Sequence, residues 1–259
     1  MTFFMKLLKS LVLIVSSSLI LPGLSTRAVL AQGGPPLITD DPGTPGDGNW
    51  EINIAFTAEK RRTERSYETP ILDINYGLGD RIQLKYEIPW LVLDERGDHT
   101  KDGIGNSVFG LKWRFFDQDT EGIDMSVYPQ LKFNNSHSSV DRGLVDKGME
   151  FVLPIQLQKS WGAISLNPEL GYVFREYDEH KWIYGLAMGY QASSNLELLA
   201  EISGITGQDF EDDELVFNIG ARWELSETRV LLISAGRSFR DSASGEPEFL
   251  LYTGIQLRF

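Results

Sequence analysis

The carboxyl-terminal twelve residues constrain the fold more than any other segment of the chain. Along Glu248 to Phe259, one set of alternate positions is mainly apolar and aromatic, and it consists of Phe249, Leu251, Thr253, Ile255, Leu257 and Phe259. The positions between them are Leu250, Tyr252, Gly254, Gln256 and Arg258. Such period-two alternation predicts a β-strand with one apolar and one largely polar face, which a soluble domain rarely leaves at a frayed terminus. The pattern is typical of the closing strand of an outer-membrane β-barrel.

The amino terminus has the organisation of a secretory signal peptide. Two lysines precede an apolar run from Leu11 to Leu21, and small residues follow up to Ala31. A transmembrane anchor is the competing interpretation, but the apolar core is short and Pro22-Gly23 follow it directly. We therefore assign residues 1–31 to a signal peptide, with cleavage after Ala31.

Composition excludes several other classes of protein. No apolar run after position 31 approaches the ~20 residues that a spanning helix needs, so a membrane location requires a closed barrel. Beyond the signal there are 21 basic and 37 acidic residues, a net charge of −16, which argues against nucleic acid as a partner. The chain has no cysteine, which excludes disulfides and thiolate chemistry.

The rest of the chain repeats segments of about ten residues in which apolar and polar side chains alternate. We count twelve, and predict an all-β fold: a transmembrane, antiparallel, up-and-down β-barrel of about 12 strands over residues 49–259. In the eleventh strand, near Arg229 to Phe239, Leu231 and Ile233 compete with Val230 and Leu232 for the lipid face, so its register stays open. Short periplasmic turns are expected to alternate with mostly longer outer loops, of which the first lies around Lys60 to Ser66. Because the number of strands is even, both termini fall on the periplasmic side.

Aromatic side chains gather near the predicted strand ends, where amphipathic rings favour the membrane interface. We interpret these residues as an aromatic girdle: Trp50, Trp90, Trp113, Trp161, Trp182, Trp223 and Phe259. The alternative is that they form the core of a soluble β-sandwich. That fold would not require a signal peptide or alternation that continues to the last residue.

Charged residues of both signs occupy the positions between the lipid-facing ones. In hydrocarbon each would cost on the order of 2 to 4 kcal/mol, so they must face the barrel interior. The candidates for lining the lumen are Glu51, Asp73, Arg81, Lys85, Glu87, Lys112, Arg114, Lys132, Glu169, Arg175, Glu197, Glu201, Arg222, Glu224 and Arg258. Such charges either leave an aqueous path or pair across a narrow barrel and close it. A barrel of about twelve strands lies between filled eight-stranded barrels and open porins, so size does not decide.

A Gly- and Pro-rich leader, residues 32–48, separates the signal from the first strand and predicts neither helix nor strand. We expect this leader on the periplasmic side. It includes Thr39, Asp40, Asp41, Pro42, Gly43, Thr44 and Gly48, and Trp50 and Glu51 follow. These residues resemble the opening of outer-membrane transporters in the family named for the meta-pathway of phenol degradation. The resemblance implies passive uptake of small organic compounds, including aromatic or hydrophobic ones, and it supplies no catalytic or binding residues.

Two roles for the leader are open. Asp40 and Asp41 could enter the periplasmic mouth and pair with lumen cations such as Arg258 or Arg81. Alternatively, the leader is a flexible connection with no fixed place. Gln256 and Arg258 are the candidate lumen residues near this mouth.

Catalysis has one local candidate. His137-Ser138-Ser139 has the His-x-Ser spacing found in lipid A deacylases, but Asn134 to Gly143 has the composition of a loop, and Val140 replaces the asparagine expected after the serine. Ser and His in loops are common without chemistry, so we assign no catalytic residues, no metal and no cofactor.

The sequence therefore predicts a passive channel or transporter for small organic solutes in the cell outer membrane. A closed barrel with a structural or surface-interaction role is the alternative, and a lipid-modifying enzyme is a distant third. The expected partners are outer-membrane lipid and lipopolysaccharide, the barrel-assembly machinery through the carboxyl-terminal strand, and a small-molecule solute.

Overall fold

The computed structural model describes residues 34–210, 214–239 and 245–259, and the predicted signal peptide lies outside these ranges. The strands are β1 Trp50–Lys60, β2 Glu64–Leu78, β3 Ile82–Glu95, β4 Lys101–Ile104, β5 Ser107–Phe116, β6 Asp124–Val127, β7 Gln130–Phe133, β8 Glu150–Trp161, β9 Ile164–Arg175, β10 Lys181–Ser193, β11 Leu196–Gly207, β12 Glu214–Ser226, β13 Arg229–Ser238 and β14 Phe249–Arg258. Two short helices, α2 Gln118–Glu121 and α3 His137–Asp141, lie in connections. Neither has the length or apolarity to cross a membrane.

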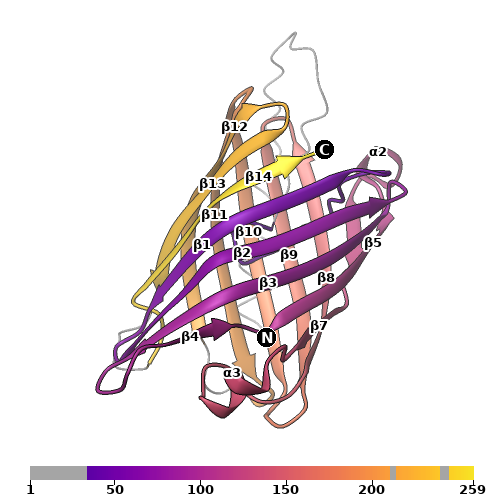
Figure 1. The fold of residues 1–259 in the computed structure, drawn as a ribbon. Helices are drawn as coiled ribbons and strands as arrows, with labels where there is room; N and C mark the ends of the chain where they lie inside the picture. The colour runs from indigo at the N-terminus through magenta and orange to yellow at the C-terminus, as the bar shows by residue number, and fades with distance from the viewer. Residues whose placement is uncertain (1–33, 211–213, 240–244) are drawn as a thin grey trace.

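The strands form one closed antiparallel barrel of 12 strands (Figure 1). β4 and β5 follow one another along β3, and β6 and β7 do the same along β8, so each pair acts as one interrupted strand. β14 pairs with β13 on one side and with β1 on the other, which closes the barrel. Counted as twelve strands, with β4–β5 and β6–β7 each taken as one, every described strand has antiparallel neighbours on both sides, although β4 itself pairs only with β3. A ring closed in this way satisfies the backbone groups that an open sheet edge would leave in hydrocarbon. The predicted up-and-down barrel is confirmed.

The two ends of the barrel differ in their connections. One end holds Phe259 and is called here the turn end. Its connections include tight turns such as the one between β8 and β9, where Trp161 pairs with Ile164. The other, the loop end, holds α3 (Figure 1). The prediction of a longer first loop around Lys60 to Ser66 is wrong, because β1 and β2 stay paired to Lys60 and Arg65 and only residues 61–63 connect them. Charged side chains indicated a loop, but outside a bilayer they are equally compatible with a paired strand.

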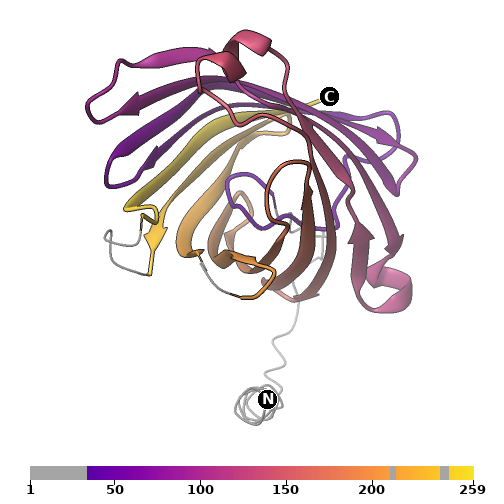
Figure 2. The same ribbon diagram turned by 90° about the horizontal axis from the view of Figure 1, so that it is seen from below.

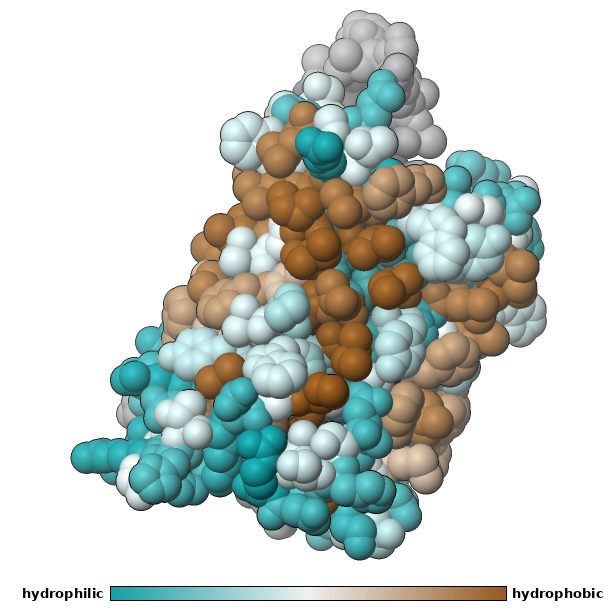
Figure 3. Space-filling model, in the orientation of Figure 1, coloured by the Kyte–Doolittle hydropathy of each residue, from teal (hydrophilic) through white to brown (hydrophobic). Residues whose placement is uncertain are grey.

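Side-chain exposure is inverted relative to a soluble protein. Large apolar residues such as Leu170 and Ile219 are 55% and 56% exposed, and apolar side chains cover the middle of the barrel (Figure 3). Towards the loop end the surface becomes hydrophilic (Figure 3). Asn53, Gln156 and Glu201, in contrast, are buried in the interior. An apolar outer band and a polar interior are what a barrel needs in a bilayer.

The structure also fixes the register of the eleventh predicted strand, which is β13. Ile233 is exposed on the outer face, whereas Val230 and Leu232 are fully buried inside. The register places Leu231 opposite Trp223 of β12, so the outer face carries Leu231 and Ile233. The apolar pair Val230 and Leu232 therefore belongs to the interior.

Candidate functional site

The leader occupies the barrel interior. Seen along the barrel, the chain that precedes β1 runs inside the ring of strands (Figure 2). Leu37 is buried there against Ala187 of β10 and Leu199 of β11. Elsewhere the leader is held mainly through its main chain, by side chains that project from the barrel wall.

Glu201 of β11 binds the centre of the leader. Its carboxylate accepts hydrogen bonds from the backbone N–H groups of Ile38, at 2.8 Å, and Thr39, at 2.7 Å. Asn218 of β12 donates a further hydrogen bond to it through Nδ2, at 2.6 Å. Glu201 is almost completely buried. A buried carboxylate is stable only when donors surround it, and here two of the three donors belong to the leader.

Arg222 of β12 binds the carbonyl groups at the start of the leader. Its guanidinium donates to the carbonyl oxygens of Gly34 and Pro35, both at 3.1 Å, and forms an ion pair with Glu197 at 3.1 Å. Ser234 of β13 continues this row by donating to the carbonyl of Pro36 at 2.6 Å. Backbone carbonyls and backbone N–H groups of the leader are thus both recognised.

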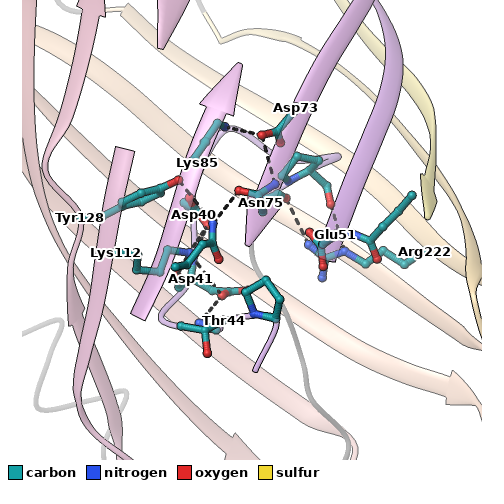
Figure 4. Close-up of a pocket in the computed structure, with 16 residues that line it drawn as sticks. Asp40, Asp41, Thr44, Glu51, Asp73, Asn75, Lys85, Lys112, Tyr128 and Arg222 are labelled. Carbon is teal, nitrogen blue, oxygen red and sulfur yellow. Dashed lines mark hydrogen bonds and ion pairs between the residues drawn. The ribbon is translucent and has the colours of Figure 1, made fainter. Parts of the chain in front are cut away.

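Lys112 of β5 holds the acidic part of the leader (Figure 4). Its ammonium lies 3.0 Å from Asp40 Oδ1 and 2.6 Å from the carbonyl oxygen of Asp41. Of the two roles left open for the leader, the structure has the docked one, and the lysine that contacts Asp40 and Asp41 in it is Lys112, where the sequence had suggested cations such as Arg258 or Arg81. The leader enters the barrel further than its mouth and so reaches β5.

Glycine in the wall makes room for the leader. A Cβ atom at Gly185 of β10 would overlap the Thr39 hydroxyl, and it would lie 3.1 Å from Thr39 Cβ. At Gly77 of β2, a Cβ would overlap the carbonyl of Gly46. At these two points the leader lies so close to the backbone of the wall strand that a side chain on the strand would overlap it.

Asp41 makes the docked leader sensitive to pH. It is 2% exposed, and one of its carboxylate oxygens, Oδ2, has no hydrogen-bond partner. Burial raises its pKa from 3.8 to about 7, against the opposing charge of Lys112, with Asp40 raising it and Arg222 lowering it. Because the docked state favours the protonated carboxyl, this group stabilises docking fully below pH 3.8 and loses that contribution as the pH rises through about 7.

We expect the leader to undock more often at pH 8.5 than at pH 5.5, which would appear as a larger mean conductance in planar bilayers. Asp41→Asn cannot titrate, so this variant should lose most of the difference between the two pH values. Asp47→Asn, on the exposed part of the leader, is the matched control. An equal pH dependence in Asp41→Asn and in the unmodified chain would contradict the assignment.

Beside the leader, the wall forms a hydrogen-bonded network (Figure 4). Asp73 accepts from Asn53 at 3.0 Å and from Asn75 at 3.1 Å, and its carboxylate lies 3.4 Å from the Lys85 ammonium. Lys85 also pairs with Glu87 at 2.8 Å. The Lys85 ammonium is thus shared between two carboxylates of this wall.

The structure places the residues proposed to line the lumen at three degrees of burial. Five are buried: Asp73, Lys112, Glu197, Glu201 and Arg222. Lys112, Glu201 and Arg222 contact the leader, Glu197 pairs with Arg222, and Asp73 belongs to the network beside the leader. Eight are half-buried: Glu51, Lys85, Glu87, Arg114, Lys132, Glu169, Arg175 and Arg258. Two are exposed, Arg81 and Glu224.

Several of the half-buried residues pair away from the leader. Towards the loop end, Glu150 forms ion pairs with Lys132, at 3.2 Å, and with Arg175, at 2.8 Å. Arg258 pairs with Glu224 at 3.3 Å near the turn end. Of the residues proposed for the aromatic girdle, Trp182 is half-buried, and the exposed members are Trp50, Trp90, Trp113, Trp161, Trp223 and Phe259.

Sequence reasoning missed the uncharged polar residues that complete this site. They are Asn53, Asn75, Gln83, Gln156, Asn167, Asn218 and Ser234, and all are buried. They alternate with lipid-facing residues, and all but Gln156 of β8 and Ser234 of β13 share a strand with a charged candidate, so the period-two pattern contained the signal. Restricting the search to charges left them out.

The His137-Ser138-Ser139 segment forms the start of α3 rather than a strand or an irregular loop. Ser139 is buried, and its hydroxyl donates to the carbonyl of Ile104 at 2.8 Å, whereas His137 is exposed. The serine hydroxyl therefore secures α3 to β4. In the described ranges, no group of three or more His, Asp or Glu side chains is arranged to hold a metal ion.

Solved structures share this fold. An outer membrane channel from Pseudomonas putida F1 is similar over 85% of this chain and 98% of its own, with a TM-score of 0.67 and 14% identity. The KdgM porin matches 80% of this chain and 99% of its own, with a TM-score of 0.56 and 10% identity. The β domain of the Bordetella autotransporter BrkA matches 84% and 99%, with a TM-score of 0.54 and 12% identity. These likenesses establish the fold.

The apolar outer band and the closed barrel place the chain in the outer membrane, as its sequence predicts. No curated protein sequence matches the chain. Residues 33–259 match the family described as "Putative MetA-pathway of phenol degradation". Since the match spans all twelve strands and the leader residues with the Thr-Asp-Asp-Pro segment, the chain belongs to this family.

Proposed function

We propose that the protein is a passive outer-membrane channel for small organic solutes, and that the leader narrows its lumen. One observation carries this proposal: the barrel interior is partly filled by a hydrogen-bonded chain segment, and most of the side chains that hold this segment are polar. Side chains of Lys112, Glu201 and Arg222 hold that segment through polar contacts that water can replace. An interior of this kind can open without unfolding the barrel.

The turn end, with its short connections and the carboxyl terminus, faces the periplasm in this proposal, and the loop end faces outward. The family is named for phenol degradation, which supports small aromatic compounds as solutes. Lipopolysaccharide around the loop end and the assembly machinery at β14 are the partners we propose. Transport through the barrel, not catalysis, is its role, in keeping with the use of Ser139 as an anchor of α3.

Single-channel recording in planar bilayers tests the function. The purified full chain should give discrete openings of small conductance, because the leader leaves only a narrow path. Migration that changes on heating a gel sample establishes that the barrel is folded. A correctly folded barrel that stays electrically silent under all conditions would refute the channel and favour a structural role.

A further inference from the structure

A cavity lies in the barrel between the leader and the wall. It has a volume of about 300 Å³, and we call it the vestibule. Pro36, Leu37 and Ile38 form part of its lining from the leader, and strands β1, β2, β3, β12, β13 and β14 supply the rest. The strand residues that line it, such as Thr57 and Leu250, belong to the loop-end halves of β1 and β14. The vestibule therefore lies on the loop-end side of the leader.

The leader gives the vestibule an apolar surface. Ile38 is 58% exposed although its backbone N–H is fixed by Glu201. Leu91 of β3 and Leu250 of β14 line the same space. A large aliphatic side chain held in an otherwise polar lumen loses contact with water only when an apolar body covers it.

The wall beside this surface presents an unpaired carboxylate. Glu59 pairs with Arg61, and Glu87 pairs with Lys85. Glu68 accepts a hydrogen bond from the Thr57 hydroxyl at 3.1 Å, and no lysine or arginine of the described ranges lies within ion-pair distance of it. A half-buried carboxylate without a counter-cation favours a positively charged ligand.

An aromatic ring completes the arrangement. The register places Glu68 of β2 opposite Thr57 of β1, and Thr57 opposite Tyr252 of β14. Glu68 and Tyr252 thus flank Thr57 on two sides, with backbones about 10 Å apart at the usual strand spacing. Both side chains line the vestibule, so a ligand between them meets a carboxylate, a ring and the apolar Ile38.

We propose that the vestibule binds small organic cations, specifically a primary ammonium carried on a short apolar or aryl body. The ammonium supplies three donors, one for Glu68, and its charge favours the face of the Tyr252 ring. The apolar body covers Ile38 and Leu91. Carboxylates are disfavoured because Glu59 and Glu68 lie on the same wall. This assignment rests on the proposed channel, and it makes Ile38 and Glu68 residues that determine specificity.

The test compares phenethylammonium with its neutral isostere phenethyl alcohol, each added at the loop end of single channels of the full chain. Phenethylammonium should reduce the current at concentrations about tenfold lower than the alcohol, as expected for one added charge-assisted contact. Glu68→Gln should bring the two within about twofold of each other. Glu224→Gln removes the same charge near the turn end and should leave the tenfold preference intact. Ile38→Ser should weaken the block of the current by both compounds.

Equal block by the two compounds, or a preference that survives in Glu68→Gln, would overturn the assignment. Calorimetric titration of the detergent-solubilised barrel with phenethylammonium separates this outcome from failure of the channel, because binding does not require conduction. A silent barrel that binds the cation through Glu68 would refute the channel and keep the site. A conducting barrel with no Glu68-dependent binding would keep the channel and refute the site.

Discussion

Deleting residues 34–45 should increase the single-channel conductance by about three- to tenfold, since the segment that occupies the barrel interior is then gone and water can take its place. The deletion removes the leader contacts with Lys112, Glu201 and Arg222 described above but none of the strand pairs. The three side chains would then face water in the lumen. We expect the barrel to fold, as shown by heat-dependent migration, and to conduct as a larger and more uniform pore.

The control for this deletion is a change of similar kind outside the lumen. Replacing residues 96–100, which connect β3 to β4, by two glycines shortens the chain at the loop end and leaves the leader in place. Its conductance should stay within about twofold of the unmodified chain. If the folded deletion variant conducts no better than the full chain, the leader is not what narrows the lumen.

Glu201→Gln should release the leader without shortening it. The glutamine amide has the same shape, but one acceptor oxygen becomes an N–H₂ donor that faces a backbone N–H of Ile38 or Thr39. A buried donor left without an acceptor costs about 1–3 kcal/mol, so the docking equilibrium should shift by about 5- to 150-fold. Brief openings to the conductance level of the deletion variant should appear in single-channel records.

Glu150→Gln is the matched control for this substitution. Glu150 is also a carboxylate of the barrel wall, but its ion-pair partners in the described ranges are Lys132 and Arg175, and no described leader residue is among them. This variant should show no new conductance level. Identical records from Glu201→Gln and from the unmodified chain would mean that the Glu201 contacts do not hold the leader.

Most of the barrel could be predicted from the sequence because its signal is periodic. Alternation along Glu248 to Phe259 predicted β14, and the same rule predicted the other strands. The register of the eleventh strand could not be predicted because Val230 and Leu232 are as apolar as Leu231 and Ile233. Leu232 is the register partner of Arg222, which binds the leader, so its inward position depends on an interior that the leader partly fills. Period-two alternation carries no information on that filling.

The site was less predictable for a different reason. Five charged candidates were found as inward-facing positions and are buried, but the leader is bound mostly through its own main-chain groups. Backbone N–H and carbonyl groups occur at nearly every residue, so no residue type marks Ile38 or Gly34 as a contact. The choice of Lys112 over Arg258 as the partner of Asp40 follows from how far the leader enters, which depends on the fit at Gly77 and Gly185.

Disulfide formation in Thr39→Cys/Gly185→Cys tests the docked leader most directly. The chain has no cysteine of its own, and the Cβ atoms at these positions lie close enough for a bridge after a small shift. Under mild oxidation, the folded barrel should lose both free thiols and keep the small conductance even at pH 8.5, until a reductant releases it. Two thiols that stay free and react independently with a maleimide in the folded barrel would contradict a leader held inside the lumen.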